Sequence, residues 1–501
     1  MITAATATSA TPALPAAPSP MRRRDFPGWL PPMLVKELRQ GLRTRGFVGA
    51  LVVFQLIMLL ATLMSLSSDF GPTPSARAAN SMLAAFFWTI LVVQLLLVTP
   101  SRALGGLQVE VDARTLDLLV LTRLNAWRIV LGKWFSLLAQ GTLLLVAMLP
   151  YLIVRYFTDN ADIIADFGRC LIMLGVSALL TAAGLWASGV ARVLRVVIII
   201  LLAASLPTVA GGFGAAFFGR PFGGGNPLSH LFELPFDLVN AVFLGAFFLV
   251  SAVRNIAPPA ENHGFFVRVL PLLALLPAAF SEMFNADSLA LRQLYIAGGF
   301  LALVLLVELA SARLPMASQW RVWRRGGPVV RGTGYCSLPG WQSAFAYAMA
   351  ATATWVVFAL IIIPTGTPVT RSEAEHAAGM ALLGLAAVVF PAVLRSFVRR
   401  RFFSPVLPYV AGIVLPVVLS WFTFWLAESR WKISAPKAVM EVFPVSSFFF
   451  GLANRNPATL VVVLQRLVAL LVLGVALWQT RPYWDRLRAL ASSEGKAPPP
   501  A

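Results

Sequence analysis

Long apolar runs dominate the chain between residues 46 and 479. Most of them hold about 20 residues, which is what an α-helix needs to cross the hydrocarbon core of a bilayer. Backbone hydrogen bonds in lipid must be satisfied within the segment, so continuous runs of this length predict helices rather than barrel strands. The pattern predicts about twelve spans, near 46–66, 80–100, 133–154, 169–190, 196–217, 233–253, 265–281, 293–312, 343–364, 377–395, 405–427 and 458–479. The seventh is the weakest, because it is short and contains Pro271 and Pro277.

The runs and the polar segments between them divide the chain into four parts. Residues 1–29 predict a disordered N-terminal tail, since the first twenty are mostly Ala, Thr, Pro and Ser. Residues 30–255 hold the first six spans, 256–480 the remaining six, and 481–501 a cytoplasmic C-terminal tail. The predicted fold class is all-α, a polytopic membrane helical bundle of about twelve transmembrane helices with cytoplasmic N- and C-termini.

Composition and charge agree with a membrane protein. Of the 501 residues, 58% are hydrophobic and 12% are charged, whereas soluble domains carry about a quarter charged residues. The net charge of +19 lies at the ends of apolar runs, so it indicates topology and not a nucleic-acid partner. With the N-terminus in the cytoplasm, 29 of the 40 lysines and arginines fall on the cytoplasmic side, as the positive-inside rule requires.

The basic segment before the first span predicts a short amphipathic helix. Pro32 suits the first turn of a helix, and Val35, Leu38 and Leu42 then share one face. The charged residues of the segment are Lys36, Glu37, Arg39 and Arg43, of which the three basic ones lie on the other face. Such a helix lies in the membrane interface with lipids as partners. The alternative is a simple basic anchor before the first span.

Catalytic, metal and ion-coupling sites find little support in the sequence. There is no G-x-x-x-x-G-K-[ST] segment to bind nucleotide phosphates, and Cys170 and Cys336 lack metal-ligand spacing. Asp69 is a lone acid, which is weak support for catalysis on a lipid-linked substrate. The candidate ionisable groups inside spans are Glu308 and Arg466. They either pair with each other or extend toward the interface, and extension is the favoured interpretation.

One polar segment between two apolar runs, residues 110–133, differs from its surroundings. Its sequence EVDARTLDLLVLTRLNAWRIVLGK carries acids early and bases late, an order that complements a helix macrodipole. Leu116, Leu119 and Val120 recur at near-helical spacing. The pattern predicts a short helix along the cytoplasmic face, which either caps the bundle or docks onto a soluble partner.

This segment resembles a motif of type-2 ATP-binding-cassette (ABC) transporter permeases, E-R-E-x-G-T-L-[ED]-x-L-L-x-[AT]-[PT] followed by I-[VL]-x-G-K. The basic segment Val35-Lys36-Glu37-Leu38-Arg39 is similar to the N-terminal interfacial helix of that family. The matching loop residues are Glu110, Asp112, Thr115, Leu116, Asp117, Leu118, Leu119 and Thr122, then Ile129, Val130, Gly132 and Lys133. Val111 and Arg114 depart from the central Arg and the Gly of the motif. The resemblance covers residues 30–255, and the second half carries no second copy of the motif.

The resemblance implies the permease subunit of an exporter in the bacterial cytoplasmic (inner) membrane, with no catalytic residue, metal or cofactor of its own. In such permeases the loop after the second span forms a coupling helix, a role that falls here on residues 107–123, Arg114 included. It implies contact with a separate ATPase subunit, which holds ATP and Mg. A homodimer or a second permease is a further candidate partner, and single-chain operation stays open beside it. Two other classes stay open, an integral-membrane enzyme acting on lipid-linked substrates and a secondary transporter.

Overall fold

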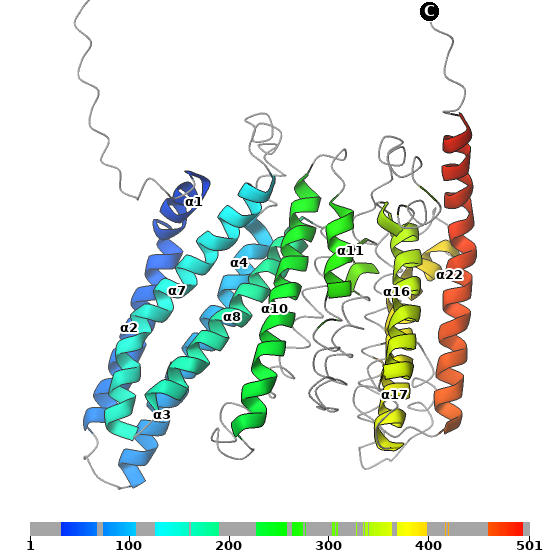
Figure 1. Ribbon diagram of the computed structural model, residues 1–501. Helices are drawn as coiled ribbons and strands as arrows, with labels where there is room; N and C mark the ends of the chain where they lie inside the picture. Colours follow the sequence, from blue (N-terminus) through cyan, green and yellow to red (C-terminus); the bar gives the residue numbers. More distant parts are fainter. Residues whose placement is uncertain are drawn as a thin grey trace, which may run out of the picture.

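The elements of this protein are helices throughout the part that the structure describes. The computed structural model describes residues 32–67, 74–106, 126–159, 162–189, 227–257, 263–273, 276, 303–305, 307–308, 327, 334, 336–338, 340–362, 368–397, 416, 419 and 459–493. Figure 1 shows the long helices standing side by side, with the N-terminal helices α1 to α10 on one side and α16, α17 and α22 on the other. The all-helical prediction is confirmed for these residues.

Within the described ranges, six helices are long and apolar enough to cross a membrane. They are α2 (Arg45–Ser67), the rod made of α3 (Pro74–Val92), η1 (Val93–Val98) and α4 (Thr99–Gly106), α7 (Ala126–Asp159), α8 (Ile163–Ser188), α10 (Pro227–Ile256) and α22 (Thr459–Ser493). Large side chains on α2 such as Leu56, Leu59 and Leu63 are exposed, which is unfavourable in water and favourable in lipid. These are the features of an integral membrane protein.

The six helices match half of the predicted spans, namely the first four, the sixth and the twelfth. α16 (Trp341–Ile362) and α17 (Pro368–Phe397) lie at the ninth and tenth predicted spans. α11 (Gly264–Leu273) covers part of the weak seventh one, with Pro271 inside it. The fifth predicted span lies outside the described residues, as do most of the eighth and the eleventh. The count of twelve and the cytoplasmic position of both termini therefore stay predictions.

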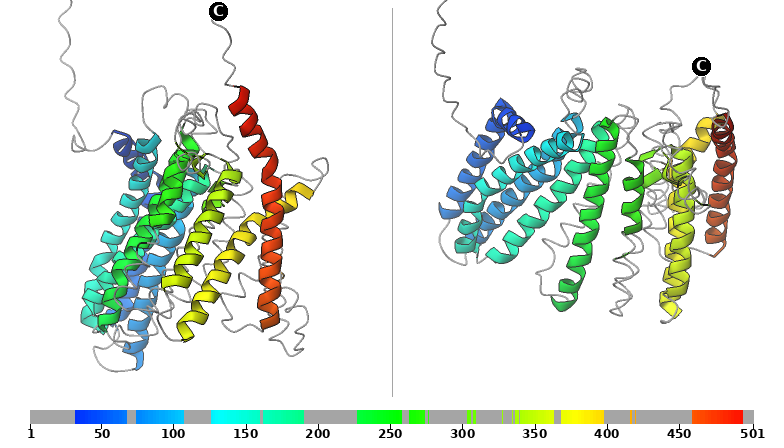
Figure 2. Two further views of the ribbon diagram at one scale, coloured as in Figure 1. Left: turned by 45° about the vertical axis from the view of Figure 1, so that its right-hand side comes forward. Right: turned by 45° about the horizontal axis from the view of Figure 1, so that its top comes forward.

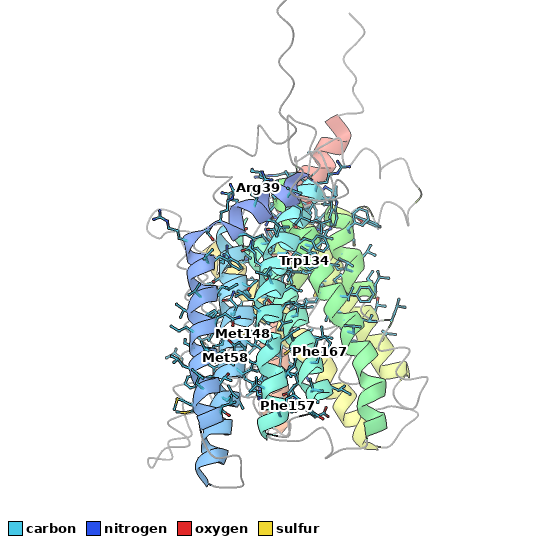
Figure 3. The ribbon with its side chains drawn as sticks, turned by 90° about the vertical axis from the view of Figure 1, so that its left-hand side faces the viewer. Arg39, Met58, Trp134, Met148, Phe157 and Phe167 are labelled. Atoms are coloured by element: carbon cyan, nitrogen blue, oxygen red, sulfur yellow. The ribbon has the colours of Figure 1, made fainter. Side chains whose placement is uncertain are left out.

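The helix before the first span is α1 (Pro32–Leu42), which begins at Pro32 as the sequence predicts. Figure 3 shows it, near the labelled Arg39, at one end of the bundle and at an angle to the long helices. Lys36, Arg39 and Arg43 are exposed, whereas Val35 and Leu38 are half-buried. The helix and its exposed basic face are thus as the sequence predicts, and its position in the membrane interface stays a prediction. We call this end of the molecule the α1 end, and the C-terminal part of α22 lies at the same end (Figure 1).

The second span contains a π-helical turn, η1, directly before Thr99 and Pro100. Pro100 has no backbone N–H and cannot make the regular bond of an α-helix. The Thr99 hydroxyl donates to the carbonyl of Gln94 at 2.9 Å, and the Ser177 hydroxyl of α8 donates to the carbonyl of Leu95 at 2.7 Å. These bonds satisfy carbonyls within the wider turn and fix α8 against it.

Two hydrophobic cores hold the helices together. The first lies between α2, α3, α7 and α8 and includes Met58 and Met148, which Figure 3 labels side by side within the bundle. The second includes Ala103, near the end of α4, and Val130, near the start of α7. It continues through α8, α10 and α11 to α16, α17 and α22. Figure 1 and the right-hand view in Figure 2 show α11 between α10 and α16. The second core therefore joins both halves of the chain.

Candidate functional site at the α1 end

The predicted coupling segment itself lies outside the described residues, but both of its flanks are described. The undescribed candidates are Glu110, Asp112, Arg114, Thr115, Leu116, Asp117, Leu119 and Thr122. α4 ends before them at Gly106, and α7 begins after them at Ala126. The geometry that can be described is therefore that of the helices into which this segment leads.

The start of α7 packs against α1. The Lys133 ammonium lies 3.4 Å from the Glu37 carboxylate, and Gly41 faces Gln140 so closely that an added Cβ would overlap the Gln140 side-chain amide. Glu37 belongs to the VKELR segment and Lys133 ends the IVLGK segment. The fold thus brings together the two segments that carry the family resemblance, although 96 residues separate them in the chain.

The other flank, α4, packs closely on α8. A Cβ added to Gly184 would lie 2.9 Å from the carbonyl oxygen of Pro100 and 3.0 Å from the Cβ of Ala103. Such an approach of two backbones needs a residue without a side chain, as is common between membrane helices. At the end of α4, Gly106 faces the Leu185 side chain. A displacement of the segment between Gly106 and Ala126 would therefore act on α4, α7, α8 and α1 together.

A buried ionic cluster lies at the same end of the bundle, where the last turn of α10 meets α11. We call it the Glu308 cluster, after its residues Arg254, Arg268 and Glu308. Arg254 donates to both carboxylate oxygens of Glu308, from Nη1 at 2.8 Å and from Nη2 at 2.7 Å. Arg268 of α11 donates to Glu308 Oε1 at 2.9 Å. Each of the three residues is at most 3% exposed.

The turn that enters α16 is shaped around this cluster. Gly340 has φ 125°, a backbone conformation that favours glycine, and its N–H donates to Glu308 Oε2 at 3.2 Å. Arg268 donates to the carbonyls of Cys336 and Leu338 in the same turn, and also to the Ser343 hydroxyl. One carboxylate thus organises α10, α11 and the start of α16.

The structure gives Glu308 two ion-pair partners that the sequence did not single out, Arg254 and Arg268, and the residue is 1% exposed. That Glu308 and Arg466 extend toward the membrane interface stays a prediction. Arg466 of α22 lies against α17, where its guanidinium would be 3.4 Å from a Cβ added to Gly379. The sequence reasoning assigned Arg254 and Arg268 to the cytoplasmic flanks. The available signal was that a carboxylate in an apolar run needs a cation, but several arginines could supply it.

A second buried cluster of similar composition lies at the opposite end of α7 and α8. We call it the Asp166 cluster, formed by Arg155, Asp166 and Arg169. The two guanidinium groups each donate to the carboxylate at 2.7 Å. The Arg155 guanidinium also faces the rings of Phe87 and Trp88, with 5.6 and 5.7 Å to the ring centroids. Figure 3 shows the labelled Phe157 and Phe167 at this end, far from Arg39.

The geometry limits what chemistry the described residues can perform. A general base needs a lone pair free to accept a proton, whereas both oxygens of Glu308 accept charge-assisted hydrogen bonds. Within the described ranges, no group of three or more His, Cys, Asp or Glu side chains is placed to hold a metal ion. Asp69, the other acid considered for catalysis, lies outside these ranges. The site is thus a set of packed and ion-paired helix ends.

Comparison of the chain with protein-family models, with curated proteins and with solved structures finds no match.

Proposed function

We propose that this chain is the membrane-spanning permease subunit of an ABC exporter in a bacterial cytoplasmic membrane, driven by a separate ATPase subunit that binds ATP and Mg. The observation that carries the proposal is the contact between α1 and α7, through Glu37 and Lys133 and through Gly41 and Gln140. It joins the two segments that resemble the permease family, at the end where the predicted coupling segment leaves α4 and enters α7.

The arrangement supports a mechanical role for this end. On this proposal the α1 end faces the cytoplasm, and ATP-driven closure of the partner displaces residues 107–123. The displacement reaches α4, which packs against α8 at Gly184, and α7, which packs against α1 at Gly41. Packed helices move as rigid elements, so a small movement of the loop is carried into the bundle. The permease itself contributes shape and not chemistry.

The rival classes lose support from the geometry of Glu308. An enzyme acting on lipid-linked substrates needs a carboxyl group free to exchange a proton, and a proton-coupled transporter needs an ionisable group that gains and loses its charge. Glu308 faces two arginines and a backbone N–H, which stabilise its charged form.

The test is co-expression with P-loop ATPases of the same genome, beginning with one encoded beside this chain. We expect one of them to co-purify with the chain, and the double replacement Glu110→Ala with Asp117→Ala to weaken the complex at least about tenfold. The matched control is Asp162→Asn at the opposite end, which removes one negative charge while Asn still caps α8. Failure of every ATPase to associate, or equal effects of the control and the double replacement, contradicts the proposal.

A further inference from the structure

The Glu308 cluster joins the two halves into which the sequence divides the chain. Arg254 is in the last turn of α10 and belongs to residues 30–255, whereas Glu308 and Arg268 belong to residues 256–480. The Arg254–Glu308 pair crosses the boundary between the halves, and the Arg268–Glu308 pair lies within the second half. The second hydrophobic core surrounds this junction, with Val253 on one side and Val304, Val267 and Ala344 on the other. Polar and apolar contacts therefore hold the same boundary.

In the second half, the cluster holds together α11, the segment that carries Glu308, and the start of α16. Arg268 is attached to α16 twice, since the Tyr347 hydroxyl donates to its backbone carbonyl and its guanidinium donates to the Ser343 hydroxyl at 3.1 Å. The Glu308 carboxylate accepts a hydrogen bond from the Gly340 N–H, in the turn directly before α16. α17 then packs on α16, and α22 packs on α17, within the second core. A displacement of Arg254 would reach all of these elements.

On the side of the first half, contacts lead from the cluster to α4, the described helix that precedes the predicted coupling segment. Asn255, next to Arg254, donates from Nδ2 to the carbonyl of Trp186 at 3.3 Å. Gly189, at the end of α8, lies against Asn255, with 2.9 Å between an added Cβ and the Asn255 Cβ. α8 in turn packs on α4 at Gly184. Each step is a close contact between described residues.

From these contacts we infer that the Glu308 cluster is the joint that transmits movement of α4, α8 and α10 to the second half of the chain. Sliding α10 past α11 and α16 would separate charges that are shielded from water, which is costly at low dielectric. The segments around the joint therefore move as one body. The inference rests on the proposed function for the source of the movement, while the joint itself is a property of this chain alone.

A thiol near the joint provides the test. The chain has two cysteines; Cys170 is buried and Cys336 is partly exposed, and the Cys336 carbonyl accepts from Arg268. In a Cys170→Ala background, maleimide labelling of the full-length chain in detergent reports on the turn before α16. We expect Glu308→Gln to raise the labelling rate of Cys336 at least about tenfold, because unpairing buried charges favours local opening.

The controls separate loss of the joint from general loosening. Asp166→Asn removes the same kind of charge from the Asp166 cluster and is expected to change Cys336 labelling by less than about twofold. Arg254→Lys keeps the charge but loses the bidentate contact, so the labelling rate of Cys336 should be intermediate. The same variant replaces Glu308→Gln in the test if Glu308→Gln does not give a single species in size-exclusion chromatography. Unchanged labelling in the Glu308→Gln and Arg254→Lys variants, or an equal increase in Asp166→Asn, overturns the joint.

Transmission is measured in the complex with the partner ATPase. ATP with vanadate, which traps the closed ATPase, should change Cys336 labelling in the Cys170→Ala chain and in Asp166→Asn, and leave it unchanged in Glu308→Gln. A nucleotide response in Glu308→Gln equal to that of the parent shows that movement bypasses the cluster and overturns the inference. If no ATPase associates, the proposed function fails, and the joint is judged on the labelling of the chain alone.

Discussion

The Glu308 cluster and the Asp166 cluster use the same chemistry at opposite ends of the bundle. Each places two guanidinium groups around one buried carboxylate. The Asp166 cluster joins residues 11 and 3 positions apart on consecutive helices, whereas the Glu308 cluster joins residues 54 and 40 positions apart. The first fixes one helical hairpin and the second fixes two halves of a chain. The same functional groups thus have different structural consequences, which depend on which parts of the backbone carry them.

The two clusters also differ in what would remain if the acid were removed. Around Asp166, Arg155 would keep its contacts with the Phe87 and Trp88 rings, and the Arg169 side chain is 17% exposed. Around Glu308, Arg268 would keep its bonds to the turn before α16, but both arginine side chains are at most 3% exposed and would lack a counter-charge, and the Gly340 N–H would lose its acceptor. The Glu308 cluster should therefore be the more sensitive of the two.

The largest effect is expected from Glu308→Gln. The replacement keeps the size of the side chain but leaves two buried guanidinium groups without their counter-charge, which costs about 3–5 kcal/mol. Thermal unfolding of the detergent-solubilised chain, followed by far-UV circular dichroism, measures the loss. A loss under about 1 kcal/mol would mean that water or another anion replaces the carboxylate, and that the cluster is not a structural centre.

Asp166→Asn should cost less, about 2 kcal/mol, because aromatic rings and solvent compensate the arginines in part. The same unfolding assay applies. Combined with Glu308→Gln, the two losses should add within about 0.5 kcal/mol, as expected for sites that share no partner. A loss larger than that of Glu308→Gln would reverse the ranking of the two clusters.

Two glycines of α8 test how closely this helix packs on α4. Gly184→Ala should cost about 1–2 kcal/mol, because the new Cβ would meet the backbone of α4. Gly175→Ala on the same helix is the matched control, since a Cβ there meets nothing within 4 Å, and it should be neutral or stabilise by up to about 1 kcal/mol. Equal effects of the two replacements would show that α4 and α8 are not tightly packed at Gly184.

The smallest effect is expected at the Glu37–Lys133 pair. The Glu37 side chain is 18% exposed and the atoms are 3.4 Å apart, so Glu37→Gln should change the unfolding free energy by about 0.2–1 kcal/mol. A double-mutant cycle with Lys133→Met isolates the pair. A coupling above about 2 kcal/mol would place this pair with the buried clusters and not with the partly exposed pairs.

Several elements could be predicted because local pattern alone specifies them. α1 begins at Pro32 and exposes Lys36 and Arg39 because proline and amphipathic spacing act within one helix. Length and hydropathy located the first four spans in the same way. The end of α22 was less predictable: it continues to Ser493, beyond the predicted span, since polar residues are equally compatible with a helix outside the bilayer.

The partners of Glu308 could not be predicted from the pattern. Sequence showed that a carboxylate within an apolar run needs a cation, and Arg254, Arg268 and Arg466 were all available. Which of them is near Glu308 depends on how α10, α11 and α22 pack. The basic residues at span ends were interpreted as topology signals. For Arg254 and Arg268 that interpretation missed a second role, because a charge count does not register burial.

The sequence by itself determined that this protein is an array of apolar helices and roughly which stretches of the chain form the described ones; it also supplied the resemblance on which the proposed coupling role rests. These properties depend on the composition and periodicity of residues that are neighbours in the chain, because local hydropathy decides whether a segment is more stable in water or in lipid. Only the tertiary structure decided that α1 contacts α7, and that Arg254, Arg268 and Glu308 meet at the junction of the two halves. Those contacts depend on residues tens of positions apart, and only the packing of the whole chain sets their distances.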